Sequence, residues 1–509
     1  MSSINRRRFL QKMTGGIAAS MLIPSLKANN KAGNNRKNVL FIAVDDLRTQ
    51  LNCYGKTQIK SPNIDRLSEE GLTFNNAFCQ HATCGASRAS LLTGLRDDST
   101  GIIGLHPKVE EALPNHLTMP QNFKKHGYQT ISLGKIYHRG DDDKKGWSQK
   151  PWRALDKYFG RGYITSESKK EVMQRRRKKV GDYWIVEDAD AEKGPATEMA
   201  DVPYNGYSDG ELADRAVKEL RNLKNSQNPF FLGVGFRKPH LPFCAPKKFW
   251  DMYDREELDL ADNPFFPKGA TKYTMNGMGE LEGYVDMPDR IKEGGLPEKT
   301  ARRLIHGYNA CVSYIDFCIG LVINELDRLN LREDTIIILW GDHGWKLGEH
   351  GAWAKHTNFE VDTKVPLIID VPDMQSEGAK SDALVELVDL YPTLCDLCEL
   401  TKPDNLEGYS FTPLLEDANR TWKEAIFSQY PRSRRNADKL VMGYTVRTEN
   451  YRYVEWVHVK SGEIKSRELY DRSKDPQENT NVVDNPAYKS IVIQMQKTLD
   501  RGWEGALPN

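Results

Sequence analysis

The 509-residue chain carries 72 Lys and Arg against 71 Asp and Glu, so its formal net charge is only +1. This balance excludes a whole-molecule attraction to nucleic acid or to a membrane surface, and any anion must be recognised by a local site. The length suffices for one large domain and a smaller one. Eight cysteines in a chain of this size do not predict a disulfide framework.

The N-terminus has the pattern of an export signal. Asn5–Lys12 contains three consecutive arginines, and the weakly apolar run from Gly15 to Leu26 follows it. The alternative is a disordered basic tail. We predict a twin-arginine-type signal peptide over residues 1–30 and export, to the periplasm of a Gram-negative bacterium. No later stretch is expected to span a membrane.

Four apolar runs rich in β-branched or aromatic residues predict strands buried on both faces, as in a parallel sheet. They are Asn38–Val44, Tyr128–Leu133, Pro229–Phe236 and Thr335–Trp340. Each is followed by groups able to bind ions or move protons: Asp45 and Asp46, Lys135 and His138, His240, and Asp342 with His343. Parallel strands deliver such groups to one sheet edge, where ligands bind in open α/β folds.

Helical patterns alternate with these strands, which predicts a doubly wound α/β domain. The expected helices begin at Pro62 or cover Leu117–His126, Asp209–Leu223 and Ala301–Leu329. We place this domain at residues 31–400. Residues 139–205 are charge-dense and are predicted to form an inserted surface segment. Its charged runs are expected to be solvated faces, with a polyanion-binding patch as the alternative.

The chain changes character after Leu400, and residues 401–509 are predicted to form a smaller α+β domain. Met442–Arg447 and Tyr451–Val457 alternate around a turn, as in a β-hairpin. A terminal helix is expected near Tyr488–Arg501. Cys395 and Cys398 form a C-x-x-C pair within a helical stretch, and core packing is favoured over zinc or redox chemistry because no second pair accompanies them.

The stretch from Cys84 to Gly94 has the most specific composition in the chain. Gly85 and the small residues after it predict a helix start at Cys84, where free N–H groups favour an anion. Arg88, one turn on, adds a guanidinium suited to an oxyanion. A cysteine in this setting is typical of a reactive thiol, with an ordinary half-buried cysteine as the alternative.

This stretch resembles the signature of the type I sulfatases, in which the cysteine is oxidised to formylglycine. Ala86 stands where many members have Pro, a form that bacterial radical-type maturases accept. Further segments resemble the branch that contains iduronate 2-sulfatase: Val44–Arg48, Ser61–Asp65, Lys238–His240, Asp342–Trp345, Leu347–Gly351, Trp353–Lys355 and Ser428–Arg432. The resemblance implies an alkaline-phosphatase-like mixed sheet flanked by helices, with a small C-terminal antiparallel sheet domain.

The acids after the first and last predicted strands provide hard oxygen ligands, which suit Ca²⁺ better than zinc. Together with the resemblance they imply one Ca²⁺ held by Asp45, Asp46, Cys84 as formylglycine, Asp342 and His343. A histidine in such a set is unusual for calcium, and the resemblance places it in the iduronate 2-sulfatase branch.

The resemblance also implies a role for each catalytic residue. Formylglycine from Cys84, as its hydrate, attacks sulfur; Arg88 holds the hydrate and the sulfate, and Asp342 takes the attacking proton. Lys135 and Lys355 neutralise the sulfate, His240 is the acid for the leaving oxygen, and His138 expels sulfate in the second step. Covalent catalysis of this kind splits one difficult displacement into two easier steps.

The implied partners are a sulfated oligosaccharide and a formylglycine-generating maturase. The sugar is expected to be a terminal sulfated uronic acid or another unit of ulvan, carrageenan or a glycosaminoglycan. Its selection is assigned to residues 139–205, residues 244–300 and the cluster of Arg432, Arg434 and Arg435. The alternatives are a phosphodiesterase or phosphonate hydrolase of the same superfamily and a non-catalytic binder of sulfated glycans.

Overall fold

A computed structural model of the chain describes residues 36–508, apart from 106–107, 139–141, 155–157, 177–178, 181–182, 185–191, 276, 289–290, 292–294 and 434–435. The proposed signal peptide therefore lies outside the described residues, as do Arg434 and Arg435. The side chains of the basic run at 175–179 are also outside the description.

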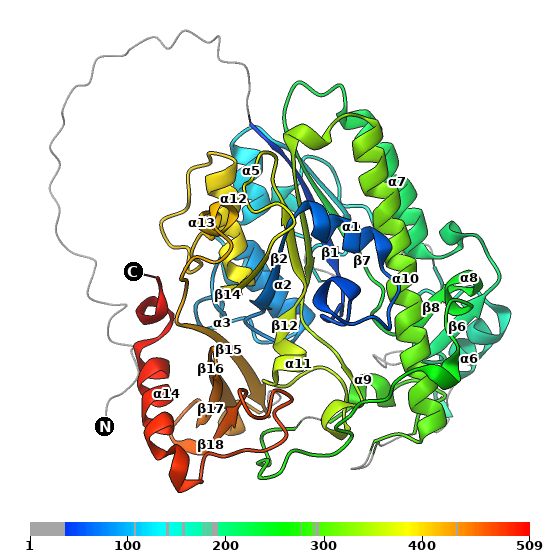
Figure 1. The fold of residues 1–509 in the computed structure, drawn as a ribbon. Coiled ribbons are helices and arrows are strands. Elements are labelled where there is room, and N and C mark those ends of the chain that lie inside the picture. Colours follow the sequence, from blue (N-terminus) through cyan, green and yellow to red (C-terminus); the bar gives the residue numbers. More distant parts are fainter. Residues whose placement is uncertain are drawn as a thin grey trace, which may run out of the picture.

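A mixed eight-stranded sheet forms the centre of the large domain (Figure 1). Its order is β12 (Lys364–Val365), β2 (Leu72–Phe78), β13 (Leu367–Asp370), β9 (Thr335–Gly341), β1 (Asn38–Val44), β7 (Phe230–Phe236) and β3 (Gln129–Gly134), with β14 (Lys380–Glu386) beside β2. The four strands expected from the sequence are β1, β3, β7 and β9, and they pair in parallel. Their carboxyl ends consequently meet at one edge.

Helices cover both faces of this sheet, because successive side chains of a strand point to opposite faces. Leu40, Ile42 and Val44 pack into one core, and Val39, Phe41 and Ala43 pack into the other. The first core includes side chains of α1 (Pro62–Glu70), α7 (Ser208–Leu223) and α10 (Glu298–Arg328), and the second includes those of α2 (Cys84–Thr93), α5 (Met119–Lys125), α12 (Leu390–Leu397) and α13 (Thr412–Glu416). The expected helices form within a few residues of their predicted ends.

Helix α10 differs from the sequence expectation in one respect. It is long and apolar enough to cross a membrane, and 83% of its most apolar 18-residue window is buried inside the protein. Its apolar side chains pack against the sheet and α7, as in the core helix of a globular domain.

Residues 139–205, as far as the structure describes them, combine exposed positions with positions packed into the interior. They contribute α6 (Ser166–Arg176) and β6 (Thr197–Ala200), which pairs with β8 (Phe243–Pro246), and Tyr163 and Val172 join the first core. Asp143, within a run expected to be solvated, is buried and accepts hydrogen bonds from Thr118 and Gln121. These contacts replace the solvent that the charge density predicted.

The C-terminal part forms a separate four-stranded antiparallel sheet. It contains β15 (Ala425–Arg432), β16 (Val441–Thr448), β17 (Tyr451–His458) and β18 (Ile464–Asp471), and α14 (Lys489–Arg501) packs on one face (Figure 1). The β16–β17 pair is the expected hairpin. All eight cysteines are buried and unpaired, including Cys395 and Cys398, in agreement with core packing.

Candidate active site

The parallel strands bring the predicted acids and cations together at one edge of the sheet. Asp45 and Asp46 follow β1, Asp342 and His343 follow β9, and Lys135 follows β3. The three aspartates and His343 are wholly buried. The backbone N–H of Asp46 donates to Asp342 Oδ1 at 3.0 Å, which links the ends of β1 and β9.

Cys84 lies at the first position of α2, as expected. Its Sγ lies 3.1 Å from His343 Nε2 and 3.9 Å from Asp46 Oδ1. Gly85 allows this approach, because a Cβ there would lie 2.5 Å from the carbonyl oxygens of Gly104 and Leu105. The helix N-terminus therefore delivers position 84 into the acid cluster.

Two buried cations, Arg88 and Lys355, and the partly exposed Lys135 neutralise part of this negative charge. Arg88 Nε donates to Asp342 Oδ2 at 2.8 Å, and its Nη2 lies 3.5 Å from Asp45 Oδ1. Lys135 Nζ lies 2.5 Å from Asp45 Oδ2, and Lys355 Nζ lies 2.8 Å from Asp46 Oδ1. The cations bridge the acids from different elements, so the cluster depends on the tertiary structure.

The geometry fits a divalent cation. Ligand atoms of Asp45, Cys84, Asp342 and His343 all lie within 4.8 Å of one another. Asp46 Oδ2 is buried and makes no hydrogen bond, which is costly for a carboxylate oxygen unless a cation or proton meets it. His343 Nδ1 faces the carbonyl of Gly344 at 2.9 Å, which leaves Nε2 directed at the cluster. The five residues predicted as metal ligands are thus brought together.

The pKa values of the two acids after β1 are shifted in opposite directions. Burial would raise the pKa of Asp45, but Lys135, His240 and Arg88 outweigh it and hold that pKa well below its usual range. Burial raises the pKa of Asp46 well above its usual range, and repulsion from Asp45 and Glu280 adds to it against the opposing charge of Lys355. A bound cation would favour the ionised form of both carboxyls.

The thiol of Cys84 is not activated in this setting. Burial and the negative charge of Asp45 raise its pKa well above the ordinary value, although Lys135 and Lys355 act in the opposite direction. Burial and the adjacent acids therefore favour the neutral thiol, in opposition to the helix N-terminus, which favours the thiolate. The reactivity expected of position 84 stays a prediction.

His240 and a carboxylate missed in the sequence complete the described cluster. His240 Nε2 lies 3.1 Å from Glu280 Oε1, and Glu280 Oε2 lies 3.3 Å from Lys355 Nζ. Glu280 belongs to the short helix α9 (Gly279–Glu282), within residues assigned only to substrate selection. No motif surrounds it, and only its contacts reveal its place.

Burial and the Lys355 charge lower the pKa of His240 to about 3, whereas Asp45 and Glu280 act in the opposite direction. Glu280 therefore favours the protonated form of this imidazole. An anionic sulfate ester beside Lys355 would act in the same sense.

The remaining predicted residue, His138, follows Lys135 by three positions on the same loop after β3. Its catalytic role stays a prediction. Arg432 lies outside the acid cluster, at the end of β15, and its Nη1 donates to the carbonyl of His356, the residue after Lys355.

The α/β fold and this buried cluster of carboxylates, cations and a helix-terminal cysteine define a class of protein. The class is the hydrolases of the alkaline phosphatase superfamily. The protein-family model described as Sulfatase matches residues 37–400, and the model described as N-sulphoglucosamine sulphohydrolase, C-terminal, matches residues 348–504. The chain belongs to the sulfatase family and is a sulfuric ester hydrolase.

Several known proteins resemble the chain over nearly its whole length. Iduronate 2-sulfatase of Homo sapiens is 34% identical, with 92% of this chain and 95% of that protein covered. A sulfatase of Formosa agariphila is 31% identical, with coverages of 92% and 87%.

Among solved structures, a protein in complex with its substrate D-glucosamine-2-N,6-O-disulfate superposes with a TM-score of 0.71 at 23% identity, covering 92% of this chain and 98% of that one. The phosphonate monoester hydrolase of Agrobacterium radiobacter gives 0.69 at 21%, with coverages of 91% and 95%. These likenesses confirm the expected fold class.

Proposed function

We propose that the protein hydrolyses sulfate esters on an anionic carbohydrate. One observation carries this: position 84, at a helix N-terminus, lies in a buried cluster that contains three cations and the acids of two strand ends. Such a cluster suits the negatively charged oxygens of a sulfate or phosphate ester, because preorganised charges act strongly where water is excluded.

The chemistry of the proposal needs two groups that this chain's residues would hold. Formylglycine made from Cys84 would supply the nucleophilic oxygen, and one Ca²⁺ held by Asp45, Asp46, Asp342 and His343 would neutralise the charge of the incoming ester. The position of Cys84 Sγ, 3.1 Å from His343 Nε2, supports this proposal.

The chain's own side chains have distinct tasks in this proposal. Lys135 and Lys355 bind the sulfate oxygens, and Arg88 fixes Asp342 and the backbone of Ile136 in place. Asp342 accepts the proton of the attacking group, and His240 Nε2 donates a proton to the leaving sugar oxygen. His138 then acts as the base for release of sulfate.

The proposed substrate is a terminal sulfated uronic acid or another sulfated sugar of ulvan, carrageenan or a glycosaminoglycan. The 34% identity to iduronate 2-sulfatase supports a sugar of the uronate type. We also propose that the chain is exported through its N-terminal segment to a periplasm, and that a maturase acts on Cys84 before or during export.

Sulfate release tests this function. The protein is co-produced with a radical-type maturase and incubated with sulfated fragments of ulvan, carrageenan and dermatan, with Cys84→Ala as the control because alanine cannot be oxidised to an aldehyde. Release by the wild type and a loss of at least about 10³-fold in the variant are expected. Equal release by both proteins would overturn the proposal.

The phosphonate hydrolase alternative is tested by the same preparations. Their relative kcat/KM values on 4-nitrophenyl sulfate and on a phenyl phosphonate ester separate the two activities. A preference for the phosphonate would favour the alternative, and binding of the sulfated fragments without turnover by formylglycine-containing protein would favour a silent binder.

Metal removal gives an independent check. Dialysis against EGTA should abolish turnover, and added Ca²⁺ should restore it, because the adjacent carboxylates repel the ester without a cation. Full activity after removal of all divalent metal, verified by elemental analysis, would contradict the proposed Ca²⁺ role.

A further inference from the structure

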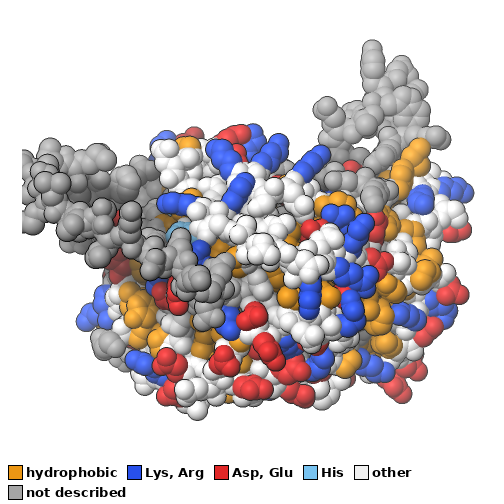
Figure 2. Space-filling view, turned by 90° about the horizontal axis from the view of Figure 1, so that it is seen from above, with side chains coloured by type: hydrophobic (Ala, Val, Ile, Leu, Met, Phe, Trp, Pro, Cys, Tyr) orange, Lys and Arg blue, Asp and Glu red, His pale blue; other side chains and the backbone are white. Residues whose placement is uncertain are grey.

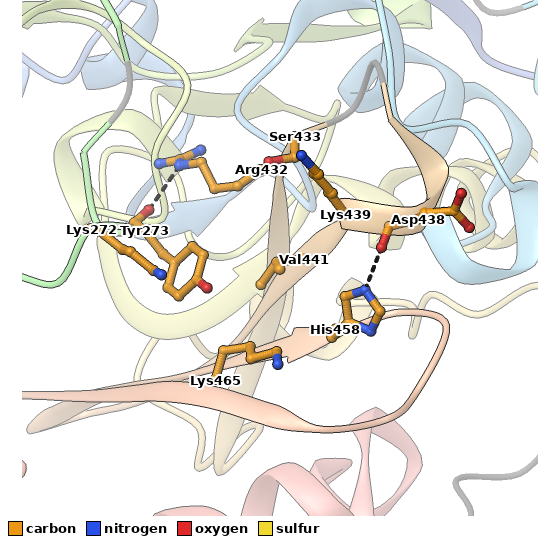
Figure 3. A pocket seen from close by; sticks show the side chains of 9 residues that line it. All are labelled: Lys272, Tyr273, Arg432, Ser433, Asp438, Lys439, Val441, His458 and Lys465. Atoms are coloured by element: carbon orange, nitrogen blue, oxygen red, sulfur yellow. Dashed lines mark hydrogen bonds between the residues drawn. The ribbon is translucent and has the colours of Figure 1, made fainter.

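A cationic pocket lies where the C-terminal sheet meets a loop of the large domain. Its volume is about 520 Å³, and its lining includes Lys272, Tyr273, Arg432, Lys439 and Lys465 (Figure 3). The lining comes from the 272–273 loop, the end of β15, the turn before β16 and the start of β18. None of these elements belongs to the catalytic cluster.

Arg432 forms a rigid wall of this pocket. Its Nε donates to the carbonyl of Tyr273 at 2.8 Å, and its Nη2 donates to that of Thr274 at 3.0 Å. The guanidinium also lies 5.0 Å from the ring of Tyr430 and 5.1 Å from that of Trp456. These contacts hold the guanidinium of Arg432 in a fixed position.

The rest of the lining is mainly cationic. Lys272 and Lys439 are exposed, and Lys465 pairs with Glu463 at 2.5 Å. Asp438, the acid of the lining, pairs with Lys460 at 2.8 Å. On the face shown in Figure 2, both cationic and acidic side chains are exposed. The pocket therefore suits an anion.

An aromatic surface accompanies the charges. Tyr273 stacks on Trp456 of β17, with ring centroids 5.8 Å apart and an interplanar angle of 29°. Pockets that bind small organic groups combine such rings with a few fixed polar groups. A sugar ring that carries a carboxylate or sulfate matches both parts of this lining.

The pocket adjoins the active site through the backbone. Arg432 Nη1 donates to the carbonyl of His356 at 3.1 Å, and His356 directly follows Lys355, whose Nζ contacts Asp46. The ring of His356 also lies 5.8 Å from that of Tyr430, which contacts Arg432. These contacts bring the wall of the pocket close to the backbone that carries Lys355.

We propose that this pocket is a second sugar-binding site, which holds the carboxylate or sulfate of a unit beyond the one being desulfated. The inference rests on the proposed function, because it assumes that the substrate is an anionic oligosaccharide. It assigns the protein a preference for chains over single sugars. Lys272 and Lys439 would bind the anion, and Tyr273 would contact the sugar ring.

The test uses the double variant Lys272→Gln, Lys439→Gln, with Lys218→Gln, Lys497→Gln on exposed positions of α7 and α14 as the matched control. Sulfate release is measured on a dermatan sulfate tetrasaccharide, an ulvan tetrasaccharide and 4-nitrophenyl sulfate. The ratio of kcat/KM for a tetrasaccharide to that for the aryl sulfate should fall about tenfold, through KM, in the pocket variant. The control should keep the wild-type ratio.

An unchanged ratio in the pocket variant would overturn the inference, as would an equal loss on all three substrates, which indicates a structural role. Binding of the same tetrasaccharides to Cys84→Ala protein, by calorimetry, gives a readout independent of turnover. A loss of affinity on adding the pocket substitutions supports the pocket even if the wild type releases no sulfate. Affinity that is absent, or equal with and without these substitutions, overturns it.

A tetrasaccharide that keeps only the sulfate of its terminal unit separates the two anions, because the active site still has its sulfate to bind. Retained, pocket-dependent binding assigns the site to a carboxylate, and loss of binding assigns it to a sulfate. Affinity should also fall as NaCl is raised, because exposed charges are screened.

Discussion

At the scale of single residues, the site combines groups whose charges are set by their neighbours. His240 is the clearest example, because burial and Lys355 oppose its protonation while Glu280, 3.1 Å away, favours it. Its Nδ1 faces the carbonyl of Leu241 at 2.6 Å, which directs Nε2 into the site. Both contacts prepare this nitrogen to hold a proton for a leaving group.

Substitution His240→Gln tests the acid role. For a sugar sulfate, kcat should fall by about 10²–10⁴-fold, because an alkoxide is a poor leaving group without a proton. For 4-nitrophenyl sulfate the loss should be much smaller, since the phenolate leaves readily. Steady-state kinetics on both substrates measure the difference. Equal losses would assign His240 to sulfate binding instead.

Glu280 is a positioning residue for this imidazole. Glu280→Gln should lower kcat for the sugar sulfate by about tenfold, the effect of roughly one pKa unit on the acid. It should spare the aryl sulfate, as His240→Gln does. Glu257→Gln, on an exposed turn of the same part of the chain, is the control. A uniform loss on both substrates would indicate that Glu280 only supports the local structure.

At the scale of elements, close backbone contacts position the catalytic side chains. Strands β3 and β7 approach so closely beyond Gly134 that a Cβ on Gly235 would lie 2.2 Å from the carbonyl carbon and oxygen of Lys135. The N–H of Lys135 in turn donates to the carbonyl of Gly235 at 2.7 Å. The position of the Lys135 side chain thus depends on a glycine in the neighbouring strand.

The substitution Gly235→Ala should therefore shift Lys135 away from Asp45. We expect a loss of about 1–3 kcal/mol in the free energy of unfolding, as in overpacked cores, and a reduced kcat/KM. Denaturant unfolding and kinetics check both. Gly277→Ala is the control, because a Cβ there meets nothing within 4 Å. Wild-type stability and activity of Gly235→Ala would refute this account.

At the scale of the whole molecule, buried ion pairs join the C-terminal sheet to the large domain. Glu478 accepts from Arg452 Nε of β17 at 2.6 Å and from the backbone N–H of Glu360 in the large domain at 2.9 Å. Arg472 lies 2.8 Å from Glu360 as well. Burial would raise the pKa of Glu478, but Arg452 and Arg472 outweigh it and lower that pKa to about 2.

Glu478→Gln should reduce the free energy of unfolding by about 3 kcal/mol at pH 7, because the buried guanidinium of Arg452 loses its counter-charge. The folded-state pKa lies below the ordinary value of 4.5, so the contribution is complete above that value and is lost as pH falls toward 2. Denaturation at pH 7 and pH 3 should show a smaller difference at the lower pH. Glu111→Gln, from an exposed pair with Lys108, should have no effect. A pH-independent difference would contradict the ionic account.

Local sequence patterns were enough to predict the strands β1, β3, β7 and β9, the main helices and the residue types of the cluster. Buried strands carry continuous apolar runs, and parallel pairing sends the groups after them to one edge, so local patterns sufficed. The signature at Cys84–Gly94 indicated the family through its residues alone.

The pKa shifts of these groups, and the distant residues that contact them, became visible only in the folded chain. The helix N-terminus predicted an activated thiol at Cys84, but burial and the acids Asp45 and Asp342, the latter more than 250 positions away in sequence, raise the pKa of this thiol. Glu280 carries no local motif, and the sequence indicated Arg432 for sugar selection without showing the pocket around it. Their roles depend on long-range contacts and burial, and these are properties of the folded chain that no short stretch of sequence encodes.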